Sequence, residues 1–240
     1  HIPLIHGADG AKLSKRHGAV GVEEYRNQGY LQGAVFNALR RVGWSHGDDE
    51  IISREQAVEW FDLADVNRGA SRLDTDKMLA LNAHYLKEQD ASTLLTLAGP
   101  FIEAEGWTDI DADGLARLTL AMPAVADRAK TLADVGSMAK YYLQEPPIGI
   151  EEKAQKALSE EGLAVLTDML GVLGDVVDWT EEGIKSAMME YAETKELKVG
   201  KVFQPLRAAL TGAMASPGVT EVAFAFGKEK TLRHLQAVLG

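Results

Sequence analysis

Two lysines near the start of the chain have the spacing of a phosphate-binding loop. In the segment DGAKLSKRHG, Lys12 and Lys15 lie on either side of Ser14, with glycines at positions 10 and 18. Glycine lets the backbone approach a ligand closely, and ammonium groups are mobile point charges that suit phosphate oxygens. Such charges count most where phosphate charge develops in a transition state. The segment is consistent with phosphoryl chemistry, and the alternative is a solvated basic loop.

The rest of the chain offers no complete catalytic constellation. It has no cysteine, its six histidines include no His-Glu-x-x-His pair, and no Gly-x-Ser-x-Gly, Walker or dinucleotide-binding motif is present. The segment DIDADG at 109–114 resembles the start of a calcium loop, but Leu120 stands where that loop needs a bidentate glutamate. We interpret it as a polar turn that caps a helix, and we interpret His84 as a core residue rather than a metal ligand. No metal site is expected.

Charge is unevenly distributed along the 240 residues, whose net charge is −11. Residues 1–47 hold six Lys/Arg against three Asp/Glu, a net +3, and residues 201–240 hold five against two, also +3. The segment 48–113 holds five against sixteen, and 151–200 five against twelve. An acidic balance argues against nucleic acid, because phosphate neutralisation drives that binding. Two basic ends around an acidic middle keep nucleic-acid binding open.

Compartment and membrane association follow from composition. No apolar run approaches the roughly 18 residues that a membrane helix needs, and no signal peptide is visible. The absence of cysteine suits a reducing cytosol. We therefore expect a cytoplasmic protein with no membrane partner.

Hydrophobic periodicity predicts a mainly α fold with few strands. Residues 31–44 read as an amphipathic helix with Arg40 and Arg41 turned outward. Further helices are expected after Ser53, in a capping-box pattern, and after Asp74. Other start signals are Ser92, Asp111, Thr131, Thr180 and Thr220, and stop signals are Gly106, Pro146-Pro147 and Gly227. The paired prolines make 144–149 the best candidate for a domain boundary.

Several segments, taken in order, resemble the bacterial glutamyl-tRNA synthetases, a family of class I aminoacyl-tRNA synthetases. KLSKR at 12–16, preceded by Asp-Gly, is similar to their KMSKS signature. The later segments are YRNQGYLQGAVFNALRRVGWSHGDDEIIS, SRLDTDKMLALNAHYL, LKVGKVFQPLRAALTG and SPGVTEVAFAFGKEKTLRHL. Together they cover nearly the whole chain. It resembles the C-terminal portion of such an enzyme, from just before the KMSKS loop to the end.

The resemblance implies a domain order. Residues 1–18 would be the tail of the catalytic domain with its KMSKS-type loop, and 19–88 a stem-contact domain. Residues 89–147 and 148–240 would be two helical subdomains of an all-helical anticodon-binding region, with the catalytic Rossmann-like domain absent. The chain opens with His1, and we expect a fragment of a longer protein, a processed N-terminus being the alternative.

The resemblance also implies a reaction for the parent enzyme. It would join glutamate to ATP, with magnesium, to form an adenylate, and then pass the glutamyl group to its tRNA. Lys15 would stabilise the leaving phosphates with support from Lys12, and the ATP-binding loop would comprise Lys12, Leu13, Ser14, Lys15 and Arg16. The family's His-Ile-Gly-His motif does not occur in the sequence. This chain alone is therefore not expected to catalyse the reaction or to hold ATP.

By the same resemblance, several residues would contact tRNA. Arg207 would contact an anticodon base, and Arg128 matches an arginine that can read the first anticodon position. Ser216, Pro217 and Val219 would form a neighbouring base pocket, and Arg40 and Arg41 would contact the stem. Arg207 follows Pro205 in what reads as the first turn of a helix, where positive charge is unfavourable, and this favours a functional role.

Some of these residues also fit structural roles that involve no RNA contact. Arg40 and Arg41 also fit a solvated helix face, and Pro217 also fits a simple turn. The expected partners are glutamate tRNA and the missing N-terminal catalytic domain, with the chain a monomer. A free-standing acidic helical module that binds protein and has no RNA role is the alternative, and a regulatory role apart from aminoacylation is a third hypothesis.

Overall fold

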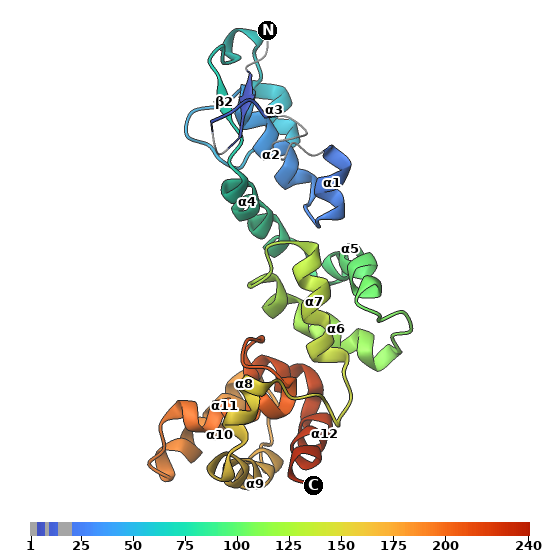
Figure 1. The fold of residues 1–240 in the computed structure, drawn as a ribbon, viewed down its shortest axis with the longest axis vertical. Helices are drawn as coiled ribbons and strands as arrows, with labels where there is room; N and C mark the ends of the chain where they lie inside the picture. The colour runs from blue at the N-terminus through green and yellow to red at the C-terminus, as the bar shows by residue number, and fades with distance from the viewer. Residues whose placement is uncertain (1–3, 8–9, 14–20) are drawn as a thin grey trace. The chain divides into compact units, whose positions relative to one another are not determined.

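The structure, a computed structural model, describes residues 4–7, 10–13 and 21–240. Across these residues it contains twelve α-helices and one two-stranded sheet, which confirms the mainly α fold (Figure 1). The chain divides into two compact units, one of residues 1–104 with 126–136 and the other of residues 105–125 with 137–240. Within the described part of the chain, the helices are all too short or too polar to span a membrane.

The first unit joins a small sheet to a helical layer. Strand β1, Ile5–His6, pairs in parallel with β2, Ser71–Arg72. The helices are α1 (Val22–Asn27), α2 (Gln32–Gly43), α3 (Arg54–Trp60), α4 (Thr75–Lys87) and α5 (Ala91–Ala104), with a short 3-10 helix at Leu63–Asp65. Helices α2 and α4 pack against each other. The core between them includes Ala34, Val35, Ala38, Val42, Met78 and Leu81.

Several helix starts in this unit follow the predicted caps. The Ser53 hydroxyl accepts a hydrogen bond from the Gln56 N–H at 3.1 Å, and the Gln56 side chain accepts one from the Ser53 N–H. Asp74 accepts from the Lys77 N–H and so caps α4. Helix α5 differs from the prediction, because Asp90 rather than Ser92 receives the bond from the first turn.

Two buried asparagines tie loops to these helices. The side-chain oxygen of Asn82 accepts from the Leu31 N–H at 2.7 Å, and the side-chain nitrogen of Asn82 donates to the Lys130 backbone carbonyl at 2.6 Å. The Asn37 side chain exchanges hydrogen bonds with the backbone of Ile52 at 2.9 and 3.1 Å. Since an unpaired buried polar group costs about 1–3 kcal/mol, both asparagines hold loop positions that helix packing alone does not fix.

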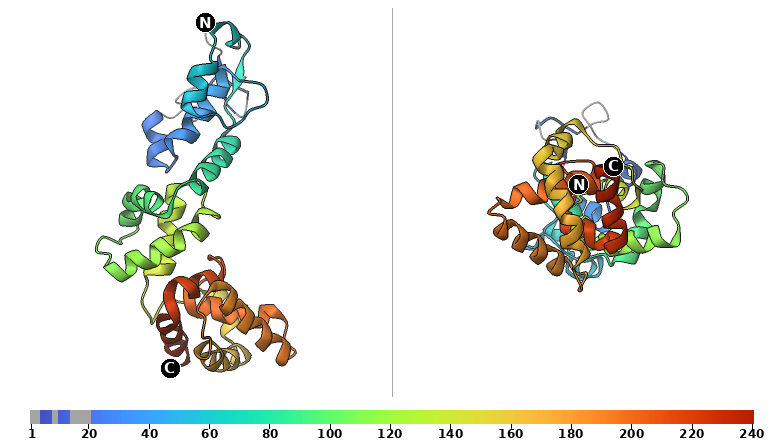
Figure 2. Two further views of the ribbon diagram at one scale, coloured as in Figure 1. Left: turned by 180° about the vertical axis from the view of Figure 1, so that it is seen from behind. Right: turned by 90° about the horizontal axis from the view of Figure 1, so that it is seen from below.

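The second unit is built from helices alone. It holds most of α6 (Ala112–Ala126), the C-terminal part of α7 (Leu132–Leu143), α8 (Glu152–Gln155), a 3-10 helix (Lys156–Leu158), α9 (Glu160–Gly174), α10 (Glu181–Thr194), α11 (Val199–Thr211) and α12 (Val219–Leu239). Helices α9, α10 and α11 all pack on α12, and Figure 2 shows this yellow-to-red group from behind and from below. Leu166, Met169 and Leu173 are fully buried, as the periodicity of α9 predicts.

Two predicted boundaries in the second unit are wrong. Helix α12 begins at Val219 rather than after Thr220, and the Gly218 N–H donates to the Glu221 carboxylate at 2.7 Å. The stop predicted at Gly227 is confirmed, because its non-helical backbone, with a φ of 76° and a ψ of 168°, divides α12 into two helices joined at a kink. Helix α11 begins at Val199, so that Pro205 lies inside it and Arg207 is well past the first turn. The argument that Arg207 opposes its local charge preference therefore falls away.

Candidate functional site

The first half of the KLSKR loop is attached to the small sheet. Lys12, which is exposed, forms an antiparallel bridge with His6. The Leu13 N–H donates to the Ile5 carbonyl at 2.9 Å, and the Leu13 side chain packs against the core of α2 and α4. Ser14, Lys15 and Arg16 lie outside the described residues. The residues that are described hold the Lys12 backbone in place, as a group that must meet phosphate requires.

The expectation that Arg40 points outward is wrong. Its guanidinium donates to the Asn37 side-chain oxygen at 3.0 Å and lies over the Trp44 ring, 5.4 Å from the centroid. Burial, and then the charge of the neighbouring Arg41, lowers the pKa of Arg40. Arg40 therefore stabilises the corner between α2 and the segment after it. The α2 period places it toward the outside, but Trp44 and the 50–52 segment fold over it.

Arg41 lies in a groove with other basic side chains. It forms an ion pair with Glu50 at 3.0 Å, and Lys77 approaches the same carboxylate at 3.4 Å. The groove has a volume of about 430 Å³, and its basic lining residues are Arg41, Arg72, Lys77 and His84. This cluster was not predicted, because its members come from α2, β2 and α4. The packing of α2 against α4 and β2 brings them together.

His84 is not the core residue that the sequence suggested. Its side chain is 41% exposed and its Nε2 lies 3.0 Å from a Glu88 oxygen, one helical turn away. Within the described part of the chain no group of three or more His, Cys, Asp or Glu side chains could hold a metal ion. Asp111 caps α6 by accepting from the Gly114 N–H at 2.7 Å, as the polar-turn interpretation predicts.

Arg207 and the loop after α11 come together in the second unit. One guanidinium nitrogen of Arg207, Nη1, donates to the Ser216 carbonyl at 2.9 Å, to the Ser216 hydroxyl at 3.0 Å and to the Pro217 carbonyl at 3.0 Å. The Tyr141 hydroxyl of α7 donates to the Ala215 carbonyl at 3.0 Å. We call residues 212–218 the α11–α12 loop. Arg207 and Tyr141 together hold its backbone in one shape.

The three residues predicted for the base pocket, and Arg128, have different surroundings. Ser216 is half-buried, and its hydroxyl accepts from Arg207 and donates to the Pro217 carbonyl at 3.1 Å. Pro217 is buried, and Val219 is 2% exposed at the start of α12. Val219 therefore packs inside the unit and supports the loop, and its side chain is not exposed for contact with a base. Arg128 is exposed between α6 and α7 and belongs to the other compact unit.

His234 is a buried titratable group on α12, beside the Phe226 ring. Burial, and then the nearby Lys230 ammonium, lowers the pKa of His234 to about 4. In the unfolded chain the His234 imidazole binds a proton near pH 6.5. The contribution of His234 to the free energy of unfolding is therefore lost as the pH falls from 6.5 toward 4. Between pH 7 and pH 5 the contribution of His234 is expected to drop by about 2 kcal/mol. Urea unfolding at both pH values measures it.

A His234→Leu variant separates this group from the carboxylates that also titrate. Between pH 7 and pH 5 its free energy of unfolding should fall by about 2 kcal/mol less than that of the parent chain. Met188→Leu, at a buried side chain that does not titrate, serves as the control and should follow the parent. An equal pH dependence in the parent and His234→Leu would contradict the assignment.

Comparison with known proteins covers the whole chain. A family model described as the anticodon binding domain matches residues 80–239, and one described as the catalytic domain of class I tRNA synthetases (E and Q) matches residues 1–80. Proteins named glutamate–tRNA ligase from Brucella ovis and Brucella melitensis are each 48% identical over all of this chain. The chain spans about half the length of these relatives, 52%.

Solved structures show the same likeness. A glutamate tRNA ligase from Elizabethkingia meningosepticum, in complex with its amino acid, superimposes with a TM-score of 0.83 at 27% identity. A glutamate-tRNA synthetase from Elizabethkingia anophelis gives 0.79 at 26%. Each match covers all of this chain and half of the solved one.

Proposed function

Since the chain belongs to the glutamate–tRNA ligase family of class I synthetases and carries its anticodon binding domain, we propose that it is the tRNA-recognition part of such a ligase. The observation that carries the proposal is the match of residues 80–239 to the anticodon binding domain. The substrate of this part is glutamate tRNA, whose anticodon it reads. Proteins read single-stranded bases by splaying them, stacking on them and bonding to their edges.

The α11–α12 loop is the proposed point of anticodon contact. Two hydrogen bonds from Arg207 to its backbone carbonyls and a third to the Ser216 hydroxyl hold the loop, and a held loop loses little conformational entropy on binding. The Ser216 hydroxyl and the Arg207 guanidinium supply the polar groups that contact a base, while Pro217 and Val219 support the loop. Arg128 is proposed to contact the first anticodon position.

The stem of the tRNA is proposed to lie along the basic groove of the first unit. Arg41, Arg72 and Lys77 line that groove and can contact phosphates, which fix the register of the RNA without reading its sequence. Glu50 pairs with both Arg41 and Lys77, so these two cations must exchange an internal partner for a phosphate. Arg40 has no part in this proposal, because it is bonded inside the unit.

The parent enzyme is proposed to use ATP with magnesium, and Lys15 and Lys12 to contact the phosphates. Residues 1–80 match part of the catalytic domain, and the described residues contain only a two-stranded sheet rather than a complete Rossmann-like fold. These lysines therefore need the remainder of the catalytic domain, which we propose as the second partner. We further propose a monomer in the cytoplasm.

A protein-interaction module is the second candidate. Exposed apolar side chains in the acidic segment favour it, since Val58 is 75% and Leu63 81% exposed. Salt separates the two candidates, because RNA affinity falls steeply as salt rises and phosphate contacts are lost. Apolar association changes little over the same range.

Chemical probing of the tRNA tests the proposed function. The chain is mixed with glutamate tRNA, and reactivity of the bases is measured nucleotide by nucleotide. Protection of the anticodon loop by the parent chain, and its loss with Arg207→Ala, is the expected result. Protection spread evenly over the tRNA would contradict the proposal that the chain contacts the anticodon.

A further inference from the structure

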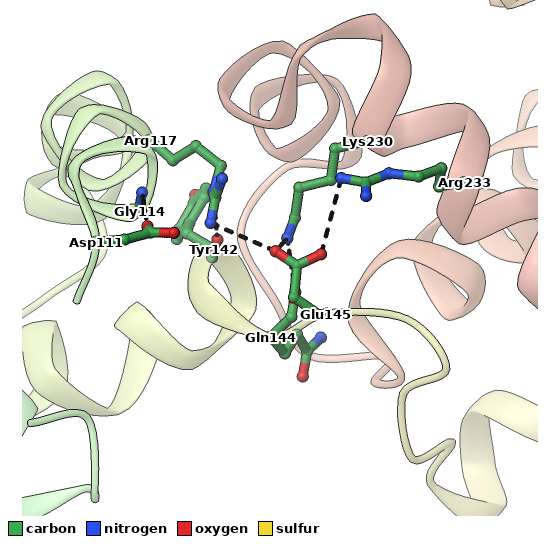
Figure 3. A network of polar contacts seen from close by, with 8 residues as sticks. All are labelled: Asp111, Gly114, Arg117, Tyr142, Gln144, Glu145, Lys230 and Arg233. Carbon is green, nitrogen blue, oxygen red and sulfur yellow. Dashed lines mark hydrogen bonds and ion pairs between the residues drawn. The ribbon is translucent and has the colours of Figure 1, made fainter. Parts of the chain in front are cut away.

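The segment between α7 and α8 is held at several points, although its prolines suggested a free boundary. We call residues 144–151 the connecting segment; it lies within the second compact unit. Figure 3 shows the Glu145 carboxylate at its centre, with three cationic side chains turned toward it. Those side chains come from α6 on one side and from α12 on the other.

Lys230 of α12 makes the closest of these contacts. Its side chain is 3% exposed, and its ammonium donates to the Gln144 carbonyl at 2.9 Å and to the Glu145 carboxylate. A buried ammonium without a counter-charge is strongly unfavourable. Burial alone would raise the pKa of Glu145, but the Lys230 bond and the charges of Arg117 and Arg233 lower it overall. Glu145 is thus the counter-ion that lets Lys230 be buried.

Arg117 of α6 approaches the same carboxylate from the opposite side. Its Nη2 lies 3.5 Å from the Glu145 oxygen, and its Nε donates to the Tyr142 carbonyl at 3.1 Å. The Arg117 side chain is only 16% exposed. Arg233, at 3.8 Å, is the exposed third cation. One carboxylate therefore balances charges from two helices that are far apart in the sequence.

The connecting segment also contacts the α11–α12 loop. The Glu151 N–H donates to the Gly212 carbonyl at 2.8 Å. Gly212, with a φ of 68°, lies so close that a Cβ there would be 2.1 Å from the Gly149 carbonyl oxygen. At the end of α7, Tyr141 donates to Ala215. The same short stretch thus touches α6, α12 and the loop that Arg207 holds.

We propose that Glu145 is a positioning residue that sets the orientation of α6 and α7 against α11, α12 and the α11–α12 loop. Without its charge, Lys230 keeps no buried counter-ion, and Arg117, Lys230 and Arg233 repel one another. The two helical groups then separate at this point, while each keeps its own core. The consequence for tRNA reading rests on the proposed function.

Distance measurement tests the positioning itself. The chain has no cysteine, so spin labels can be placed through Ala116→Cys on α6 and Gln236→Cys on α12, both exposed. The labelled chain should give one narrow distance distribution. Glu145→Gln, which keeps the shape and removes the charge, should broaden or shift it.

Glu161→Gln is the matched control, because Glu161 forms a single exposed ion pair with Lys201 in the same unit. It should leave the distribution unchanged. A distribution that is the same in Glu145→Gln and in the parent chain would overturn the proposal.

Binding measures the consequence for the tRNA. The quantity is the ratio of affinities for glutamate tRNA and for the same tRNA with its anticodon replaced. Glu145→Gln should lower this ratio by at least about fivefold, the lower end of coupling between linked sites. Glu145→Asp, which keeps the charge, should retain more of it. A variant that is only less stable, but still folded at the assay temperature, would bind both tRNAs with an unchanged ratio.

The two measurements separate the outcomes. A broadened distribution with a lowered ratio supports the proposal. A broadened distribution with an unchanged ratio, while Arg207→Ala still lowers it, keeps the positioning role, overturns its consequence for tRNA reading and leaves the proposed function standing. If the parent chain itself shows no anticodon preference, the proposed function and the tRNA consequence both fail, and the distance result alone decides whether Glu145 orients the helices.

Discussion

Replacing Arg207 with alanine is expected to weaken binding of glutamate tRNA by about 1–3 kcal/mol, roughly 5- to 150-fold. The change removes the guanidinium and the three hydrogen bonds that hold Ser216 and Pro217. It should also abolish most of the preference for the native anticodon, because the loop loses its fixed shape. Fluorescence anisotropy with labelled tRNA measures both quantities.

Lys201→Ala is the control for charge. Lys201 lies on the same helix as Arg207, but it is exposed and paired with Glu161 at 2.9 Å. Its removal should change affinity less than twofold and leave the preference intact, since an exposed ion pair contributes little. Equal effects of the two substitutions would mean that Arg207 acts only through its charge.

Lys15→Ala in the full-length ligase is expected to slow glutamyl-adenylate formation by about 10²–10³-fold. An ammonium aimed at charge that develops on phosphate contributes to the transition state by this order. Pyrophosphate exchange measures the step without involving tRNA release. The affinity for tRNA should stay near that of the parent enzyme, because Lys15 acts on ATP.

Arg26→Ala controls for loss of a cation in the same region. Arg26 is exposed in the last turn of α1, and its removal should leave the exchange rate unchanged. An unaltered rate in Lys15→Ala would remove the phosphate role from the loop. The 240-residue chain alone should give no exchange at all.

Local signals predicted much of the fold. Ser53, Asp74, Asp111, Thr131 and Thr180 all cap helices as expected. These caps can be read from sequence because a side-chain oxygen and the backbone N–H it bonds are only two or three residues apart. Helix α11 was misplaced for the same reason. Its N-cap residue, Lys198, forms no side-chain capping bond, so no local signal marks the start of the helix.

The surroundings of the site residues could not be predicted. Arg40 reads as exposed on a helical period, yet Trp44 and Asn37 contact it. Lys230 reads as another surface lysine of a basic end, yet it is 3% exposed beside Glu145. The partner that decides its burial is 85 residues away in the sequence. The family resemblance pointed to Arg207 and Ser216, whose roles stay predictions, but not to the bonds that join them.

The paired prolines show the difference between a local signal and its surroundings. They end α7 as expected, since helix stops at Leu143. They do not create a flexible link, because the connecting segment is bonded to α6, α12 and the α11–α12 loop. The four-part division of the chain stays a prediction.

Binding of the 240-residue chain to glutamate tRNA, beside an unrelated tRNA and at two salt concentrations, tests the central claim most directly. The account predicts selective binding of glutamate tRNA that weakens steeply as salt rises. Equal binding of both tRNAs, or binding that does not respond to salt, would contradict it.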